Sequence, residues 1–151
     1  MEKEVLVCSR AYKLMTNEID WSGNKETGGI LLGIINDKQI IIVEAVDGGP
    51  NSTASQTSFS YDYKYVEHVT ERIIHLYTQK LNIIGVWHKH NNYHEYPFSG
   101  QDLELHEEIC GLVGGFGISI LFQRKEEATY EMSTYIIYSG EKYQKTEFNI
   151  L

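Results

Sequence analysis

The sequence contains little cysteine: Cys8 and Cys110 are its two cysteines in 151 residues. They lie far apart and form no CxxC spacing, so neither a disulfide framework nor a cysteine-based zinc site is indicated. Unpaired cysteines usually behave as small buried hydrophobic residues, and we expect both to do so. A chain of this length can bury a substantial core without such links, so a metal site here would serve function rather than folding.

Basic side chains and long apolar runs are also scarce. Thirteen Lys and Arg residues face twenty-one acidic residues, for a net charge of −8, which disfavours a nucleic-acid or anionic-membrane partner. No apolar run approaches the length of a membrane span, and the N-terminal MEKEVLVCSR has charges where a signal peptide needs apolar residues. We therefore expect a cytoplasmic protein with a single domain over residues 1–151.

Apolar periodicity predicts the elements of the first half of the chain. A short strand over residues 4–8 precedes a helix that Ser9 could cap and that ends before a loop over residues 20–25. The continuous apolar run 27–35 and the run 39–46, separated by an Asn-Asp turn, predict a hairpin.

The second half begins after a loop over residues 47–58, rich in Gly, Pro, Asn, Ser and Thr and longer than most connections. The remaining pattern predicts an amphipathic helix over 65–80, a buried strand over 81–87, a helix over 100–110 and strands over 117–124, 128–138 and 142–150. This order of elements indicates an α+β fold, with a central mixed sheet flanked by helices.

The stretch GVWHKHNNYHEYPFSGQD, which follows the predicted buried strand, combines three histidines with two acids. His88 and His90 would point to the same side of a strand because side-chain direction has period two. A catalytic zinc site needs about three protein ligands. Asp102, in the first turn of the following helix, could be the third. The spacing therefore predicts a metal site formed by His88, His90 and Asp102.

Other polar residues near this motif have alternative interpretations. Ser99 could cap the helix or donate a hydrogen bond to an oxyanion, and the spacing does not decide between the two. Glu26, just before the first hairpin strand, is the candidate general base. We expect His94 to face solvent rather than the metal, and we favour a surface position for His106 over a role supporting the metal ligands.

Three separated motifs, taken in order, resemble the JAMM or MPN family of zinc metalloproteases, and its compact prokaryotic JAB-type members in particular. They are ETGGILLG from Glu26, HKH from His88, and SGQD from Ser99. In the family these positions hold a general acid/base, two zinc ligands, an oxyanion-stabilising serine and the third ligand, in that order. The similarity covers residues 9–125. Lys89 and Asn91 depart from common family residues, and one extra residue separates His90 from Ser99.

The resemblance implies a cytidine-deaminase-like fold, one Zn²⁺ per chain, and catalysis by Glu26 and Ser99. It implies a deubiquitinase-like isopeptidase that cleaves a ubiquitin-like protein from a conjugate or processes its C-terminal tail. Similar bacterial enzymes occur beside E1-like and E2-like proteins, several of them in antiviral defence. Two alternatives remain: a hydrolase of smaller amide or peptide conjugates, and a non-catalytic MPN scaffold.

Overall fold

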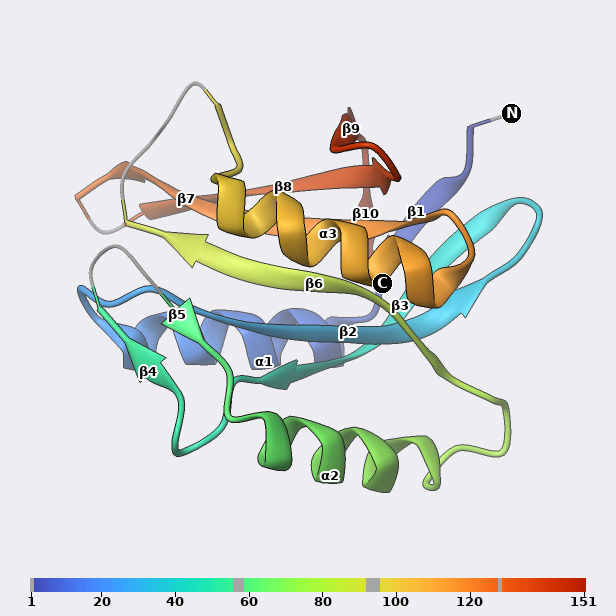
Figure 1. Cartoon of the computed structure of the whole chain (residues 1–151), viewed down its shortest axis with the longest axis horizontal. Coiled ribbons are helices and arrows are strands. Elements are labelled where there is room, and N and C mark those ends of the chain that lie inside the picture. Colours follow the sequence, from blue (N-terminus) through green and yellow to red (C-terminus); the bar gives the residue numbers. More distant parts are fainter. Residues whose placement is uncertain (1, 56–58, 92–95, 128) are drawn as a thin grey trace.

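The computed structural model describes residues 2–55, 59–91, 96–127 and 129–151, and these form a mixed sheet with three helices (Figure 1). The helices are α1 (Ser9–Ser22), α2 (Tyr63–Ile74) and α3 (Gly100–Val113). The strands are β1 (Glu4–Val7), β2 (Thr27–Ile35), β3 (Gln39–Asp47), β4 (Thr53–Ala54), β5 (Phe59–Ser60), β6 (Asn82–His90), β7 (Phe116–Glu126), β8 (Thr129–Tyr138), β9 (Lys142–Thr146) and β10 (Asn149–Ile150).

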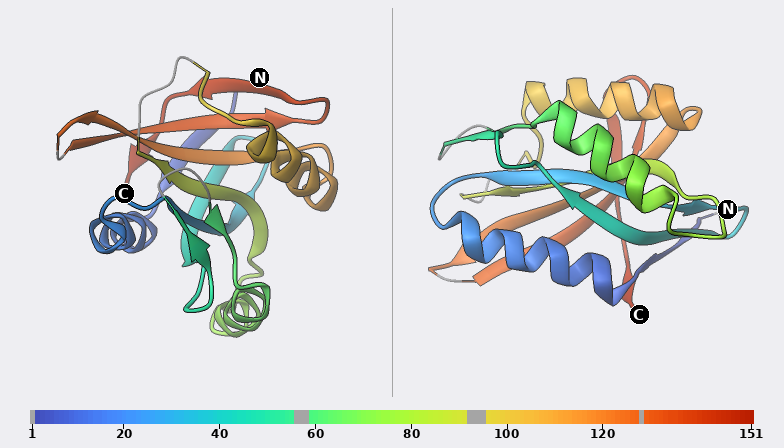
Figure 2. Two further views of the ribbon diagram at one scale, coloured as in Figure 1. Left: turned by 60° about the vertical axis from the view of Figure 1, so that its left-hand side comes forward. Right: turned by 90° about the horizontal axis from the view of Figure 1, so that it is seen from below.

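Eight of these strands form one sheet in the order β10-β1-β3-β2-β6-β7-β8-β9, and β4 and β5 form a separate small ribbon. The pairs β1–β10, β1–β3 and β6–β7 are parallel, and the other pairs are antiparallel. The sheet is curled, and α3 connects β6 to the parallel strand β7 (Figure 2). The expected α+β architecture, with a mixed sheet flanked by helices, is confirmed.

Each face of the sheet carries its own hydrophobic cluster. On one face, α1 contributes Ala11, Met15 and Ile19, which lie one helical turn apart and pack with Trp87. On the other face, Val66 of α2 and Ile109 and Cys110 of α3 pack against the sheet. Successive β6 residues alternate between these faces, so His88 and His90 lie on the side covered by α3.

The boundaries of the three described helices differ from the sequence-based prediction, and α3 continues past the expected end at residue 110 to Val113. Cys8, not Ser9, is the N-cap residue of α1, and the helix continues to Ser22 because its apolar stripe extends to Ile19. A glycine with φ of 58°, Gly23, follows its last turn. Helix α2 begins two residues earlier than expected because the Asp62 carboxylate accepts a hydrogen bond from a backbone N–H in its first turn, and it ends at Ile74 instead of residue 80.

Three further predictions, for the C-terminal strand, the loop over residues 47–58 and the cysteines, agree only in part with the structure. The predicted C-terminal strand is divided into β9 and β10, and β10 pairs with β1 at the far end of the sheet order. The expected loop over residues 47–58 contains β4, and its residues 56–58 lie outside the described part of the chain. Cys110 is buried as predicted, whereas Cys8 is only partly buried. No helix in the described ranges is long and apolar enough to cross a membrane.

Candidate metal centre

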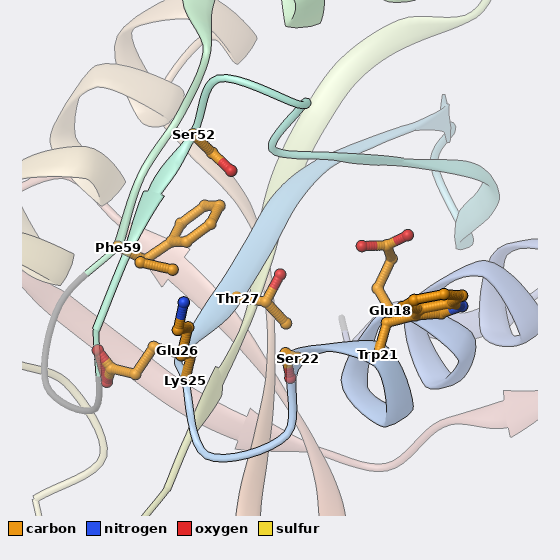
Figure 3. A pocket seen from close by; sticks show the side chains of 9 residues that line it. Glu18, Trp21, Ser22, Lys25, Glu26, Thr27, Ser52 and Phe59 are labelled. Atoms are coloured by element: carbon orange, nitrogen blue, oxygen red, sulfur yellow. The ribbon is translucent and has the colours of Figure 1, made fainter.

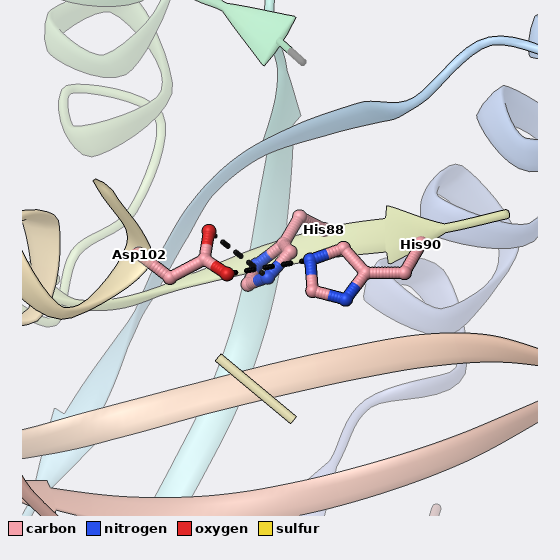
Figure 4. Close-up of side chains that lie close together, drawn as sticks. All are labelled: His88, His90 and Asp102. Atoms are coloured by element: carbon pink, nitrogen blue, oxygen red, sulfur yellow. Dashed lines mark ion pairs between the residues drawn. The ribbon is translucent and has the colours of Figure 1, made fainter. Parts of the chain in front are cut away.

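The three predicted ligands come together at the end of β6. One potential ligand atom from each of His88, His90 and Asp102 lies within 4.8 Å of the other two. The Asp102 carboxylate faces both imidazoles, with Oδ1 3.5 Å from His88 Nε2 and Oδ2 3.3 Å from His90 Nε2 (Figure 4). The spacing of two residues on β6 explains why the imidazoles share one side, and α3 supplies the carboxylate from its first turn.

A capping box fixes the orientation of Asp102. The Ser99 hydroxyl oxygen accepts a hydrogen bond from the Asp102 backbone N–H at 3.2 Å, and the Ser99 N–H donates to Asp102 Oδ2 at 2.8 Å. The helix-capping interpretation of Ser99 is therefore confirmed. Because the hydroxyl acts as an acceptor in this bond, its own proton is available to a second partner, so the oxyanion role stays a prediction.

The electrostatics of the group suit a cation. Burial alone would raise the pKa of Asp102, but its interactions with His88 and His90 outweigh burial and hold that pKa below its usual range. His88 is only 8% exposed, and its Nε2 makes no hydrogen bond to any described residue. Buried polar atoms without a hydrogen bond are costly, and a metal ion bound between this nitrogen and the Asp102 oxygen 3.5 Å from it would satisfy both. The His-His-Asp group could therefore bind a metal ion.

Glu26 lies beside this group, immediately before β2. Its Oε1 is 4.0 Å from His90 Nε2, and its backbone N–H donates to the Ser55 carbonyl at 2.7 Å. Burial raises the pKa of Glu26, while the nearby His90 partly opposes this shift. A carboxylate whose pKa is raised by burial holds an accepted proton more readily than a free glutamate, which favours the proton return that a general acid/base performs.

Lys89, between the two histidines, points to the opposite face of the sheet, where α1 lies. It is fully buried, and its Nζ donates to the Ser22 hydroxyl at 2.7 Å and the Gly23 carbonyl at 2.8 Å. A cation at the C-terminal end of α1 is favoured by the helix dipole. Asn91 similarly donates to the Asn24 carbonyl at 2.6 Å. Lys89 and Asn91 therefore attach the end of β6 to the segment leading to Glu26.

His106 is buried, so the favoured surface position is wrong. It is 2% exposed, and its Nε2 lies 3.1 Å from the Ser119 hydroxyl of β7. Its ring packs edge to face against Phe98, with the two ring centroids 4.5 Å apart. Four residues after Asp102, it turns towards the sheet and attaches α3 to it. His94 lies outside the described residues.

Tyr61 is a neighbour of the centre that sequence reasoning did not single out. Its hydroxyl donates to the Gly29 carbonyl at 3.3 Å. Burial is the main cause that raises the pKa of Tyr61, and the charges of Tyr63 and Asp102 raise it further. The sequence contains eleven tyrosines, and nothing in their spacing distinguishes this one.

Comparison with known proteins gives a fold relative and no family. No family model matches the chain, and no curated protein matches it. The solution structure of Protein DSY2949 from Desulfitobacterium hafniense is similar, with a TM-score of 0.70 over 97% of this chain and 92% of that one. The two sequences are 13% identical, so this similarity concerns the fold alone.

Proposed function

We propose that the protein is a zinc-dependent isopeptidase or peptidase of the JAMM or MPN type, with the cytidine-deaminase-like fold of that family. The observation that carries the proposal is the convergence of two imidazoles and a carboxylate within 4.8 Å, with a second, half-buried carboxylate 4.0 Å from His90. That arrangement contains the ligands and the general base that metal-assisted hydrolysis of an amide requires.

The residues present suit zinc as the metal. Two histidine nitrogens and one aspartate oxygen form a three-ligand set that leaves a coordination position open, as in catalytic zinc sites. His88, His90 and Asp102 would hold one Zn²⁺ per chain. When bound, zinc supplies Lewis acidity, which polarises a carbonyl and lowers the pKa of water.

The neighbouring side chains provide the proton transfers. Glu26 accepts a proton from the attacking water as the new carbon–oxygen bond forms. It then donates that proton to the amine nitrogen as the carbon–nitrogen bond breaks, so the leaving group departs neutral. The Ser99 hydroxyl proton, not used in the cap, stabilises the developing oxyanion.

The proposed substrate is a ubiquitin-like protein joined to a target through its C-terminal tail, or that tail before processing. A net charge of −8 favours a partner with a neutral or basic surface. E1-like and E2-like proteins in a cytoplasmic conjugation system, as in bacterial antiviral defence, would be the functional partners. Hydrolysis of smaller amides uses the same centre. A scaffold without catalysis is disfavoured because the ligand set is complete in this chain.

Glu26→Gln provides the test of catalysis. The substitution removes the proton acceptor and keeps the size of the side chain, so we expect zinc content to be retained and cleavage of a ubiquitin-like conjugate to fall by about 100-fold or more. Glu67→Gln, at an exposed position on α2, is the matched control and should cleave at the wild-type rate. Equal rates for Glu26→Gln and wild type would contradict the role of Glu26, and zinc-loaded wild type that cleaves no amide would favour the scaffold alternative.

A further inference from the structure

A pocket of about 300 Å³ lies between the C-terminal end of α1 and the β4–β5 ribbon. Its lining includes Glu18, Trp21, Lys25, Thr27 and Phe59, together with the proposed base. Figure 3 shows Glu18 and Trp21 side by side at one end of the pocket and Phe59 at the other, with Thr27 between them. The volume is at the lower end of the range for ligand pockets, about 300 to 1,000 Å³, and suits one long side chain.

The pocket adjoins the candidate metal centre. Glu26 belongs to both, because it lines the pocket and its Oε1 lies 4.0 Å from His90 Nε2. A substrate whose scissile bond lies at the centre would therefore place a neighbouring residue at the pocket. The pocket's other lining residues have no part in the proposed proton transfers. Their charge and shape can therefore determine which neighbouring substrate residue binds.

Trp21 offers an exposed aromatic surface at this pocket. It is 86% exposed, whereas the other tryptophan, Trp87, is completely buried. Trp21 follows Glu18 by three residues on α1, so the two side chains lie on the same face of the helix. An indole face beside a carboxylate is a favourable environment for a cation, which is attracted to both groups.

The carboxylate of Glu18 gives this end of the pocket a negative charge. Among the described residues, Glu18 makes neither an ion pair nor a side-chain hydrogen bond. Burial, and then the charge of Asp47, raise the pKa of Glu18, so the carboxylate lies partly desolvated near a second acid. A cation entering the pocket would relieve this repulsion. Lys25, which is exposed, is the basic side chain in the lining and would oppose such a ligand.

We propose that this pocket is a subsite that binds a lysine or arginine side chain of the substrate, through the Glu18 carboxylate and the Trp21 indole. The position of that residue next to the cleaved bond rests on the proposed function, but the binding of a basic side chain does not. A lysine whose amine forms the cleaved isopeptide bond is neutral, so the residue in the pocket is a different, charged one beside it.

Binding can be measured without catalysis, because Trp21 is an exposed fluorophore within the site. A blocked Gly-Gly-Arg-Gly-Gly peptide amide should change the tryptophan emission saturably. The same peptide with citrulline, a neutral analogue of arginine, should bind about tenfold more weakly. Glu18→Gln should weaken arginine-peptide binding by a similar factor, whereas Lys25→Gln should strengthen it. Asp20→Asn, which removes an exposed acid of α1 outside the pocket lining, is the matched control and should leave binding unchanged.

The proposal is overturned if the arginine peptide does not bind, if the citrulline peptide binds equally well, or if Asp20→Asn weakens binding as much as Glu18→Gln. Failure of the proposed function gives a different pattern. In that case zinc-loaded protein cleaves no conjugate, yet it still prefers the arginine peptide. The pocket would then be a basic-side-chain site in a protein that is not a protease.

Discussion

Two glycines at the start of β2 determine how closely the strands beside the candidate centre approach. A Cβ atom on Gly28 would lie 2.6 Å from the Trp87 carbonyl oxygen and 2.9 Å from the His88 Cβ. A Cβ atom on Gly29 would lie 1.6 Å from the Val46 carbonyl oxygen, which accepts the Trp87 indole N–H at 3.0 Å. The absence of side chains at these positions therefore allows β2 to lie close to β6 at Gly28 and close to β3 at Gly29.

Gly29→Ala should therefore be severely destabilising. The backbone must move to relieve the overlap, and we expect a loss of about 3 kcal/mol or more in the free energy of unfolding. Gly111→Ala is the matched control, because Gly111 lies inside α3 and an added methyl group would meet no described atom from outside the helix within 4 Å. That substitution should stabilise by about 0.5 to 1 kcal/mol. Urea unfolding of both variants measures the difference, and equal effects would contradict the close approach.

At the residue scale, the sequence predicts which three side chains converge at the candidate metal centre, but it does not predict all of their surroundings. The shared side of His88 and His90 follows from the two-residue period of a strand. The proximity of Asp102 follows from its place in the first turn of the next helix. Tyr61 and the Glu18–Trp21 pair could not be predicted, because each meets the site through contacts between elements distant in the sequence.

At the scale of elements, α3 is the part of the fold that connects the centre to the sheet. Ser99 caps its first turn and orients Asp102, and His106 attaches the next turn to Ser119 of β7. Burial, followed by the nearby His88, lowers the pKa of His106 from 6.5 to about 4. This imidazole is therefore neutral in the folded protein at pH 7 and down to pH values near 4.

The lowered pKa of His106 predicts a pH dependence of stability. As pH falls below 6.5, the unfolded chain takes up a proton at His106 that the folded protein does not take up until about pH 4. Stability should therefore decrease across this window, by about 3 kcal/mol from this group. His106→Gln should reduce the difference in unfolding free energy between pH 7 and pH 4.5 in metal-free protein.

His68→Gln, at an exposed position on α2, is the control and should keep the wild-type pH dependence. An unchanged difference in His106→Gln would show that His106 titrates alike in the folded and unfolded states. Urea unfolding at the two pH values makes the comparison.

The prediction of whole elements succeeded where one local signal dominates. The bounds of β2 are as expected, because a continuous apolar run ends at an Asn-Asp turn signal. Helix ends were less accurate. The start of α2 depends on a cap from Asp62 that lies outside the apolar pattern, and the extent of α1 depends on the contact of Ile19 with the sheet.

At the scale of the whole molecule, the curled sheet brings together residues from the first and last thirds of the sequence. The β1–β10 pair joins strands from opposite ends of the sequence, and the β6–β7 pair is parallel because α3 crosses between the two strands. Strand order depends on non-local contacts, so the α+β class could be predicted but this topology could not. The result places Glu26, the end of β6 and the start of α3 at one position.

Metal binding at that position is decisive for the proposed function, and it is measured as the metal content of purified protein after incubation with zinc and removal of excess ion. We expect about one zinc per chain in wild type. We expect none in the double variant His88→Ala and His90→Ala. The double variant His68→Ala and His75→Ala, which removes two exposed histidines of the α2 region, is the control and should retain zinc. Absence of zinc from wild type, or equal zinc in both double variants, would contradict the metal centre.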